Sequence, residues 1–117
     1  MTETDDPRRS AERMAEAASQ LAHSTRHLDR PSDSYVVLGQ ILEAQRSIGQ
    51  TLHQLAEWHR TTAPGLHYPE DHEESALGIM TSVAELDLAA QQAEGLQETL
   101  ARAYGGNSVV QWFDVIG

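Results

Sequence analysis

The stretch that decides the fold is residues 34–60, SYVVLGQILEAQRSIGQTLHQLAEWHR. Mostly apolar residues recur within it at alternating steps of three and four, the heptad spacing of a helix that packs along another helix. This seam consists of Leu38, Ile41, Gln45, Ile48, Leu52, Leu55 and His59. Beside it run Leu42, Gly49 and Ala56, where small side chains would let a neighbouring backbone approach closely. We therefore predict one long helix over about 34–60, packed against a second helix.

The second helix is predicted over about 72–104. The same alternation recurs there, in the order Ile79, Val83, Leu86, Ala90, Ala93, Gln97, Leu100 and Tyr104. Pro64-Gly65 marks the connecting turn. Asp71 and Glu74 have the spacing of a capping box at the start of the helix, and Gly105-Gly106 is expected to end it. The two helices would then form a long antiparallel hairpin.

The register of this hairpin follows from the position of its turn. A symmetric turn near residue 66 places Gly49 opposite Val83 and His59 opposite Glu73. A small residue then faces a larger one, and a base faces an acid.

A shorter helix is predicted over about 7–28, with Asp6 as N-cap and Pro7 at the first helical position. Its apolar stripe is shallow and rich in alanine. The chain is thus expected to be a single all-α domain over 1–117. Either this helix completes a three-helix bundle, or two hairpins pair into a dimeric four-helix bundle. The shortness of the stripe favours the dimer.

The segment 107–117 is an apolar tail. Its apolar residues fall at i, i+3, i+4 and i+7, so a short amphipathic helix is possible, and an extended tail is the alternative. Exposed aromatic residues often anchor protein contacts. We therefore predict an interaction surface here, unless the tail folds back to cap the hairpin itself. Its members are Val109, Trp112, Phe113 and Ile116.

Charge and composition argue against several classes of function. The net charge is −10, and residues 61–117 hold one Arg against nine acids, a surface that repels phosphate backbones. Direct nucleic-acid binding is therefore not expected. Cysteine is absent, no apolar run reaches the roughly 18–20 residues of a membrane span, and residues 1–7 do not resemble a secretory signal. We expect a cytoplasmic protein that does not bind membranes.

The residues that could carry chemistry do not form a recognisable site. His23 and His27 are four residues apart, a spacing found in helical metal sites, and His67 and His72 flank an acidic cluster. The E-x-x-H pairs of di-metal helical bundles are absent. No nucleophile elbow or phosphate-binding glycine motif occurs either. We predict no enzyme activity, no metal and no cofactor, with a histidine-based metal protein as an alternative.

Three polar residues interrupt the apolar seams of the hairpin. Gln45, His59 and Gln97 occupy positions where buried polar groups can fix register or partner choice at a cost in stability. Together with the apolar tail, they indicate a helical protein–protein interaction module, such as an adaptor, accessory subunit or assembly factor, acting as a homodimer. An acidic decoy that imitates DNA is another interpretation of the charge.

Residues 32–104 also resemble, in shape and acidity, the small WXG-type helical hairpins secreted by actinobacteria. The resemblance implies a secreted hairpin. The W-x-G turn itself is missing, because the loop contains Ala63-Pro64-Gly65 and Trp58 is followed by His59-Arg60. The Y-x-x-x-D/E signal is missing too, because Ser108 stands four residues after Tyr104.

Overall fold

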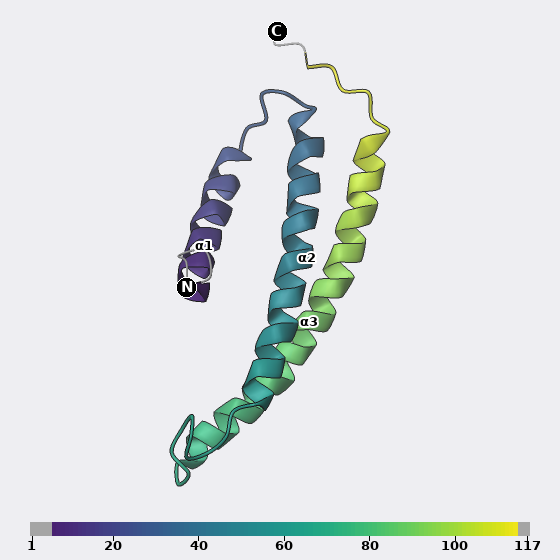
Figure 1. Cartoon of the computed structure of the whole chain (residues 1–117). Coiled ribbons are helices and arrows are strands. Elements are labelled where there is room, and N and C mark those ends of the chain that lie inside the picture. The colour runs from purple at the N-terminus through teal and green to yellow at the C-terminus, as the bar shows by residue number, and fades with distance from the viewer. Residues whose placement is uncertain (1–5, 115–117) are drawn as a thin grey trace. The chain divides into compact units, whose positions relative to one another are not determined.

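The structure, a computed structural model, describes residues 6–114 and confirms the all-α prediction. It contains α1 (Pro7–Ser24), α2 (Asp33–Arg60) and α3 (Glu73–Ser108), with no strand in the described range (Figure 1). The chain divides into two units. One unit comprises α1 and its linker up to residue 34 together with the tail from residue 111, and the other is the α2–α3 hairpin of residues 35–110.

The helix α1 begins as predicted and ends earlier than predicted. The Asp6 carboxylate accepts a hydrogen bond from the Arg8 backbone N–H at 3.1 Å, and Pro7 occupies the first helical position. The helix stops at Ser24, where the Arg26 N–H bonds back three residues to His23 in a tightened last turn. The predicted end at residue 28 was therefore wrong by about one turn.

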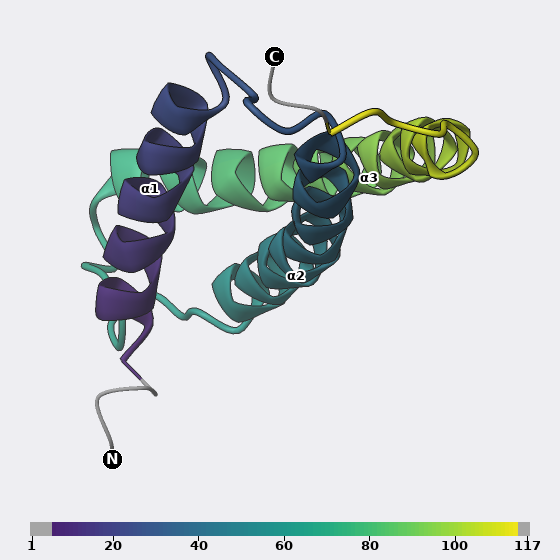
Figure 2. The ribbon, with the colours of Figure 1, turned by 90° about the horizontal axis from the view of Figure 1, so that it is seen from above.

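The α2–α3 hairpin is antiparallel, and small residues line the contact between its helices. Leu42, Ala56 and Ala93 are the buried apolar residues of the described chain. A Cβ on Gly49 would lie 3.6 Å from the Ala93 Cβ, an ordinary van der Waals distance. Figures 1 and 2 together show α3 crossing α2 obliquely. The predicted close approach along Leu42, Gly49 and Ala56 is thus confirmed, and this line forms the centre of the contact.

The register of the hairpin differs from the prediction. Gly49 lies against Ala93, about three helical turns further along α3 than the predicted Val83. At the other end, the Arg60 side chain reaches Asp87. The reason is the asymmetric loop over residues 61–72. Because it extends past the end of α2, α3 begins well beyond that end, and its first turns have no α2 residue opposite them.

The loop itself is organised around the predicted Pro64-Gly65 turn. Gly65 has φ of 83°, in the left-handed region that favours glycine, and its N–H donates to the Tyr68 carbonyl at 2.6 Å. A Cβ at this position would meet the Glu70 side chain at 2.9 Å. The turn therefore requires glycine for both its conformation and its space.

The start of α3 is capped by a histidine. His72 Nδ1 accepts a hydrogen bond from the Ser75 backbone N–H at 3.2 Å, so His72 is the N-cap. The predicted capping box of Asp71 and Glu74 was wrong by one position. Glu74 stays in the first turn, where the helix dipole favours a negative charge.

The end of α3 also departs from the prediction. Gly105 and Gly106 remain helical, and the helix continues to Ser108 with Val109 as C-cap. Glycine permits a left-handed cap without requiring it, at a cost of about 1 kcal/mol per interior glycine relative to alanine. The last turn is held by the Ser108 hydroxyl, which donates to the Gly105 carbonyl at 2.6 Å, and by the Val110 N–H, which donates to Asn107.

Candidate functional site

Gln45 connects the two helices of the hairpin by a hydrogen bond. Its Nε2 donates to the backbone carbonyl of Ala93 at 3.2 Å, in a half-buried position. Ala93 lies against Gly49 in the same layer, so the amide reaches a carbonyl that close packing brings near. A hydrogen bond across helices depends on register. The role of Gln45 in specificity stays a prediction.

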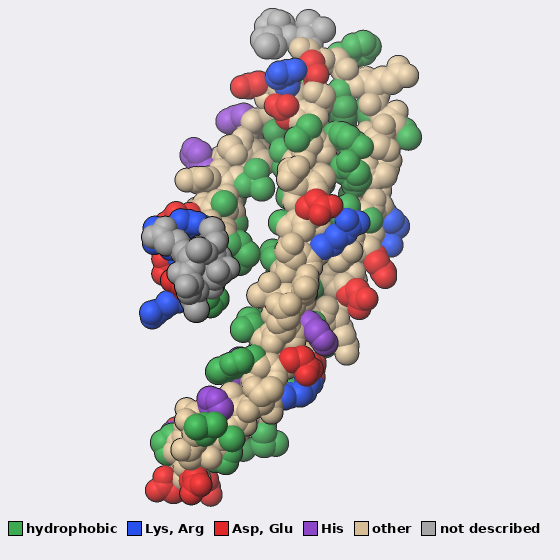
Figure 3. Space-filling view, in the orientation of Figure 1, with side chains coloured by type: hydrophobic (Ala, Val, Ile, Leu, Met, Phe, Trp, Pro, Cys, Tyr) green, Lys and Arg blue, Asp and Glu red, His purple; other side chains and the backbone are tan. Residues whose placement is uncertain are grey.

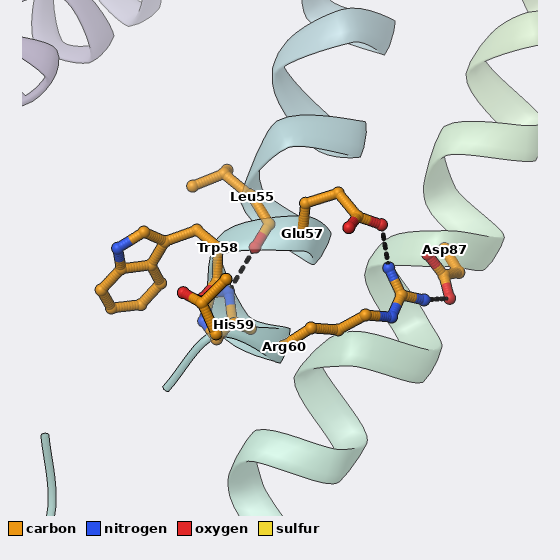
Figure 4. A network of polar contacts seen from close by, with 7 residues as sticks. Leu55, Glu57, Trp58, His59, Arg60 and Asp87 are labelled. Atoms are coloured by element: carbon orange, nitrogen blue, oxygen red, sulfur yellow. Dashed lines mark hydrogen bonds and ion pairs between the residues drawn. The ribbon is translucent and has the colours of Figure 1, made fainter. Parts of the chain in front are cut away.

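His59 lies at the end of α2 and bonds within its own helix. Its Nδ1 is 2.6 Å from the Leu55 carbonyl oxygen, and its ring stands edge-on to Trp58 at 5.0 Å between centroids (Figure 4). The predicted neighbour Glu73 is not opposite His59, because the register differs. The link to α3 is made instead by Arg60, which pairs with both Glu57 and Asp87.

Gln97 is half-buried and lines a polar groove between α2 and α3. The groove also contains charged side chains from both helices, Arg46 and His53 on α2 and Asp87 and Glu94 on α3. Acids and bases of both helices mix along it without converging on one point. This arrangement is typical of a solvated helix boundary.

An aromatic pair closes the open end of the hairpin. The rings of Tyr35 and Tyr104 stack with centroids 4.5 Å apart and planes 12° from parallel. Hydrogen bonding to the Tyr35 hydroxyl is the main cause of a raised pKa of Tyr104. Gly39 makes room for the pair, since a Cβ there would lie 3.0 Å from Tyr104 Cε1. This contact fixes how α2 and α3 align at the end of the hairpin away from the loop.

The tail after α3 is irregular from Val110 to Asp114, so its predicted alternative as an amphipathic helix is not adopted within the described residues. Val109 ends α3 and is exposed. Of the predicted anchor residues, Phe113 is 83% exposed and Trp112 is 41% exposed. Ile116 lies outside the described residues. The aromatic side chains are therefore presented to solvent, with Phe113 the more accessible.

A polar contact that no sequence pattern predicts joins the tail to the linker before α2. The Asp114 carboxylate accepts from the Ser32 backbone N–H at 2.9 Å and from the Ser32 hydroxyl at 2.5 Å. These two hydrogen bonds, together with the charge of Arg30, lower the pKa of Asp114 below its ordinary range. The pair is separated by 82 residues in the chain, so no local pattern could reveal it.

The lowered pKa of Asp114 predicts how this contact responds to acid. A carboxyl group whose pKa is lower in the folded state contributes stability above its ordinary value of about 4, and that contribution is lost as the pH falls through the lowered pKa. We expect the contact with Ser32 to persist at neutral pH and to be lost in acid below about pH 4. An NMR titration of the Asp114 carboxyl and the Ser32 amide measures this.

The matched control is Asp114→Asn, which removes the carboxylate at every pH. The Ser32 amide of this variant should show no acid transition of its own. An Asp114 carboxyl that titrates at or above the ordinary aspartate value in the unchanged chain would contradict the prediction.

Two histidines near the loop serve local structure. His67 Nδ1 accepts from the Ala63 N–H at 3.0 Å, and His72 caps α3. His27 lies beyond the end of α1, so the predicted shared helix face with His23 was wrong. Within residues 6–114, no group of three or more His, Cys, Asp or Glu side chains is placed to hold a metal ion.

Apolar side chains remain at the surface of both hairpin helices (Figure 3). Large members of this set are exposed by more than a third of their area. On α2 they are Val36, Leu55 and Trp58, and on α3 they are Leu77, Met80, Leu88 and Leu96. The hairpin thus leaves much of its apolar surface exposed.

Comparison of the chain with protein-family models, with curated proteins and with solved structures gave no match. In the described part of the chain, none of the helices has the length and apolar character needed to cross a membrane.

Proposed function

We propose that this chain is a non-enzymatic helical interaction module that acts as a cytoplasmic homodimer. The observation that carries the proposal is the small core of the hairpin. Over the described residues, the buried apolar set is Leu42, Ala56 and Ala93, two of which are alanines. Burial of apolar surface is the main favourable term in folding, and removal of a single alanine or leucine from water contributes at most a few kcal/mol. Association with a second chain would supply the missing burial.

The exposed surface supports the same proposal. Leu55 and Trp58 are 43% and 54% exposed on α2, and Leu96 is 49% exposed on α3. Extended apolar surface of this kind is typical of helices that pack against a partner. The tail adds Phe113 as a second, smaller contact surface. Adaptors, accessory subunits and assembly factors share these features.

Light scattering on the purified full chain tests the proposal. We expect a mass of twice 12.9 kDa at micromolar concentration. A chain truncated after Val110 separates the contributions of hairpin and tail, because α3 is complete at that residue. We expect the truncated chain to remain dimeric, since the hairpin carries more exposed apolar surface than the tail. A full chain that stays monomeric up to high concentration would contradict self-association.

A further inference from the structure

One face of α2 carries no acid and no arginine along its whole length in the hairpin. It is lined by a second apolar series with heptad spacing, here named the uncharged stripe: Val37, Ile41, Ala44, Ile48, Thr51 and Leu55. None of its members is fully buried: Ala44, Thr51 and Leu55 are exposed, and Val37, Ile41 and Ile48 are half-buried, so the stripe stays partly open to solvent.

Apart from Asp33, the first residue of the helix, the charged residues of α2 lie on its other side. At 100° per residue, Arg46, Glu57 and Arg60 fall within about 80° of Gly49, which faces Ala93 of α3. Glu43 lies about 120° from the centre of the stripe. Arg60 and Glu57 are paired there. The residues that flank the stripe on the side away from α3 are Gln40, Ser47 and Gln54, all polar and uncharged. Depletion of charge at the centre is the compositional mark of a protein interface.

The stripe is also close to a palindrome. When two copies run antiparallel about an axis level with Arg46, Val37 of one copy meets Leu55 of the other, and Ile41 meets Thr51. Ala44 meets Ile48 next to the axis. Each layer pairs a larger side chain with a smaller or equal one, as interdigitating helices require. A twofold interface needs such self-complementarity.

We propose that a second copy of this chain docks on the uncharged stripe, with the two α2 helices antiparallel. This inference rests on the proposed function and names its contact surface. Two acidic hairpins repel each other through most of their surfaces. The uncharged stripe allows approach without opposing like charges, so electrostatics favours this face over the others. A central layer of Ala44 and Ile48 lets the helices approach closely at the axis.

Cysteine cross-linking tests both the surface and the direction. The natural chain has no cysteine, so introduced thiols give no background. Val37→Cys and Leu55→Cys are prepared separately, mixed and oxidised. We expect a covalent dimer in the mixture and none from either variant alone. In an antiparallel pair, residue 37 or 55 of one chain lies about 27 Å along the axis from the same residue of the other chain, too far for a disulfide. As a control, Val37→Cys mixed with Gln50→Cys, on the charged side of α2, should not cross-link.

A charge at the centre of the stripe provides an independent test. Ile48→Glu would place a carboxylate against Ala44 of the other copy, and we expect the dissociation constant to rise by about 100-fold or more. Gln50→Glu adds the same charge on the opposite side of the same helix and should leave association nearly unchanged. Circular dichroism at low concentration checks that both variants remain helical.

The outcomes separate this inference from the proposed function. A monomeric natural chain would overturn both. A dimeric natural chain whose Val37→Cys and Leu55→Cys mixture does not cross-link would overturn the uncharged stripe and leave the homodimer standing. Cross-linking of Val37→Cys with itself would show a parallel pair and overturn the antiparallel arrangement. Dimerisation that is lost on truncation after Val110 would assign the contact to the tail, against this inference.

Discussion

Replacement of Ala56 by Glu will unfold the α2–α3 hairpin. Ala56 is 0% exposed and lies in the line of small residues at which α2 meets α3. A carboxylate there would be removed from water, and the nearest arginine on the same helix face, Arg60, already pairs with Glu57 and Asp87. An uncompensated buried charge costs roughly 3–5 kcal/mol, which is comparable with the whole stability of a small domain.

Circular dichroism during thermal and urea unfolding measures this effect, at equal protein concentrations. Ala84→Glu is the matched control, because Ala84 is exposed on α3 and the same substitution there adds the same charge. We expect the control to unfold within about 0.5 kcal/mol of the natural chain. If Ala56→Glu and Ala84→Glu unfold at the same temperature, the close contact between α2 and α3 at Ala56 is wrong.

Leu42→Ala will be the most damaging truncation of an apolar side chain in the hairpin. Leu42 is the largest of the three buried residues of the described chain. The other two, Ala56 and Ala93, are too small to fill the space that its side chain would leave. Large-to-small substitutions of buried leucine cost about 2–5 kcal/mol, depending on how far the surroundings relax. Because two helices can close on a gap more easily than a densely packed core, we expect a loss of about 2–3 kcal/mol.

Leu88→Ala on α3 is the control for this truncation. Leu88 is 46% exposed, so the same removal of side-chain atoms should cost less than about 1 kcal/mol. Urea unfolding gives both free energies, and an unchanged slope would show that the unfolded states are comparable. Equal losses for the two variants would mean that Leu42 is not the centre of the hairpin core.

Sequence periodicity was sufficient to predict the helices and insufficient to predict how they align. The alternation in α2 and the Gly49–Ala56 line predicted both a long helix and the residues at its contact. The register depends on the loop over residues 61–72, whose asymmetry is a property of its tertiary path. Likewise, the first backbone N–H groups of α3 could be capped by the Asp71 carboxylate or by the His72 ring nitrogen, and the structure has His72 as the cap. Such alternatives differ by about 1 kcal/mol or less, below what residue preference can resolve.

In the candidate site, too, some features could be predicted from the sequence and others depend on the tertiary structure. Gln45 was predicted as a polar residue of the seam, and it bonds to the Ala93 carbonyl. His59 and Gln97 were predicted for the same role, but their positions depend on the register that the sequence does not determine. The contact of Ser32 with Asp114 joins the linker before α2 to the apolar tail, 82 residues further along the chain. A single aspartate after an apolar run carries no signal for such a partner.

The contacts at the two ends of the hairpin also differ in the chain entropy that is lost when they form. Arg60 and Asp87 are 27 residues apart, whereas the stacked rings of Tyr35 and Tyr104 belong to residues much further apart in the chain. Because the entropy lost on closing a loop grows with the logarithm of its length, the first contact costs about 0.8 kcal/mol less to close. If the contact at the loop end forms first, the chain segment that each later contact must close becomes shorter, so contacts form in order from the loop toward the tyrosine pair. The tyrosine pair is then the last contact to form, and amide hydrogen exchange should be fastest at that end of the hairpin.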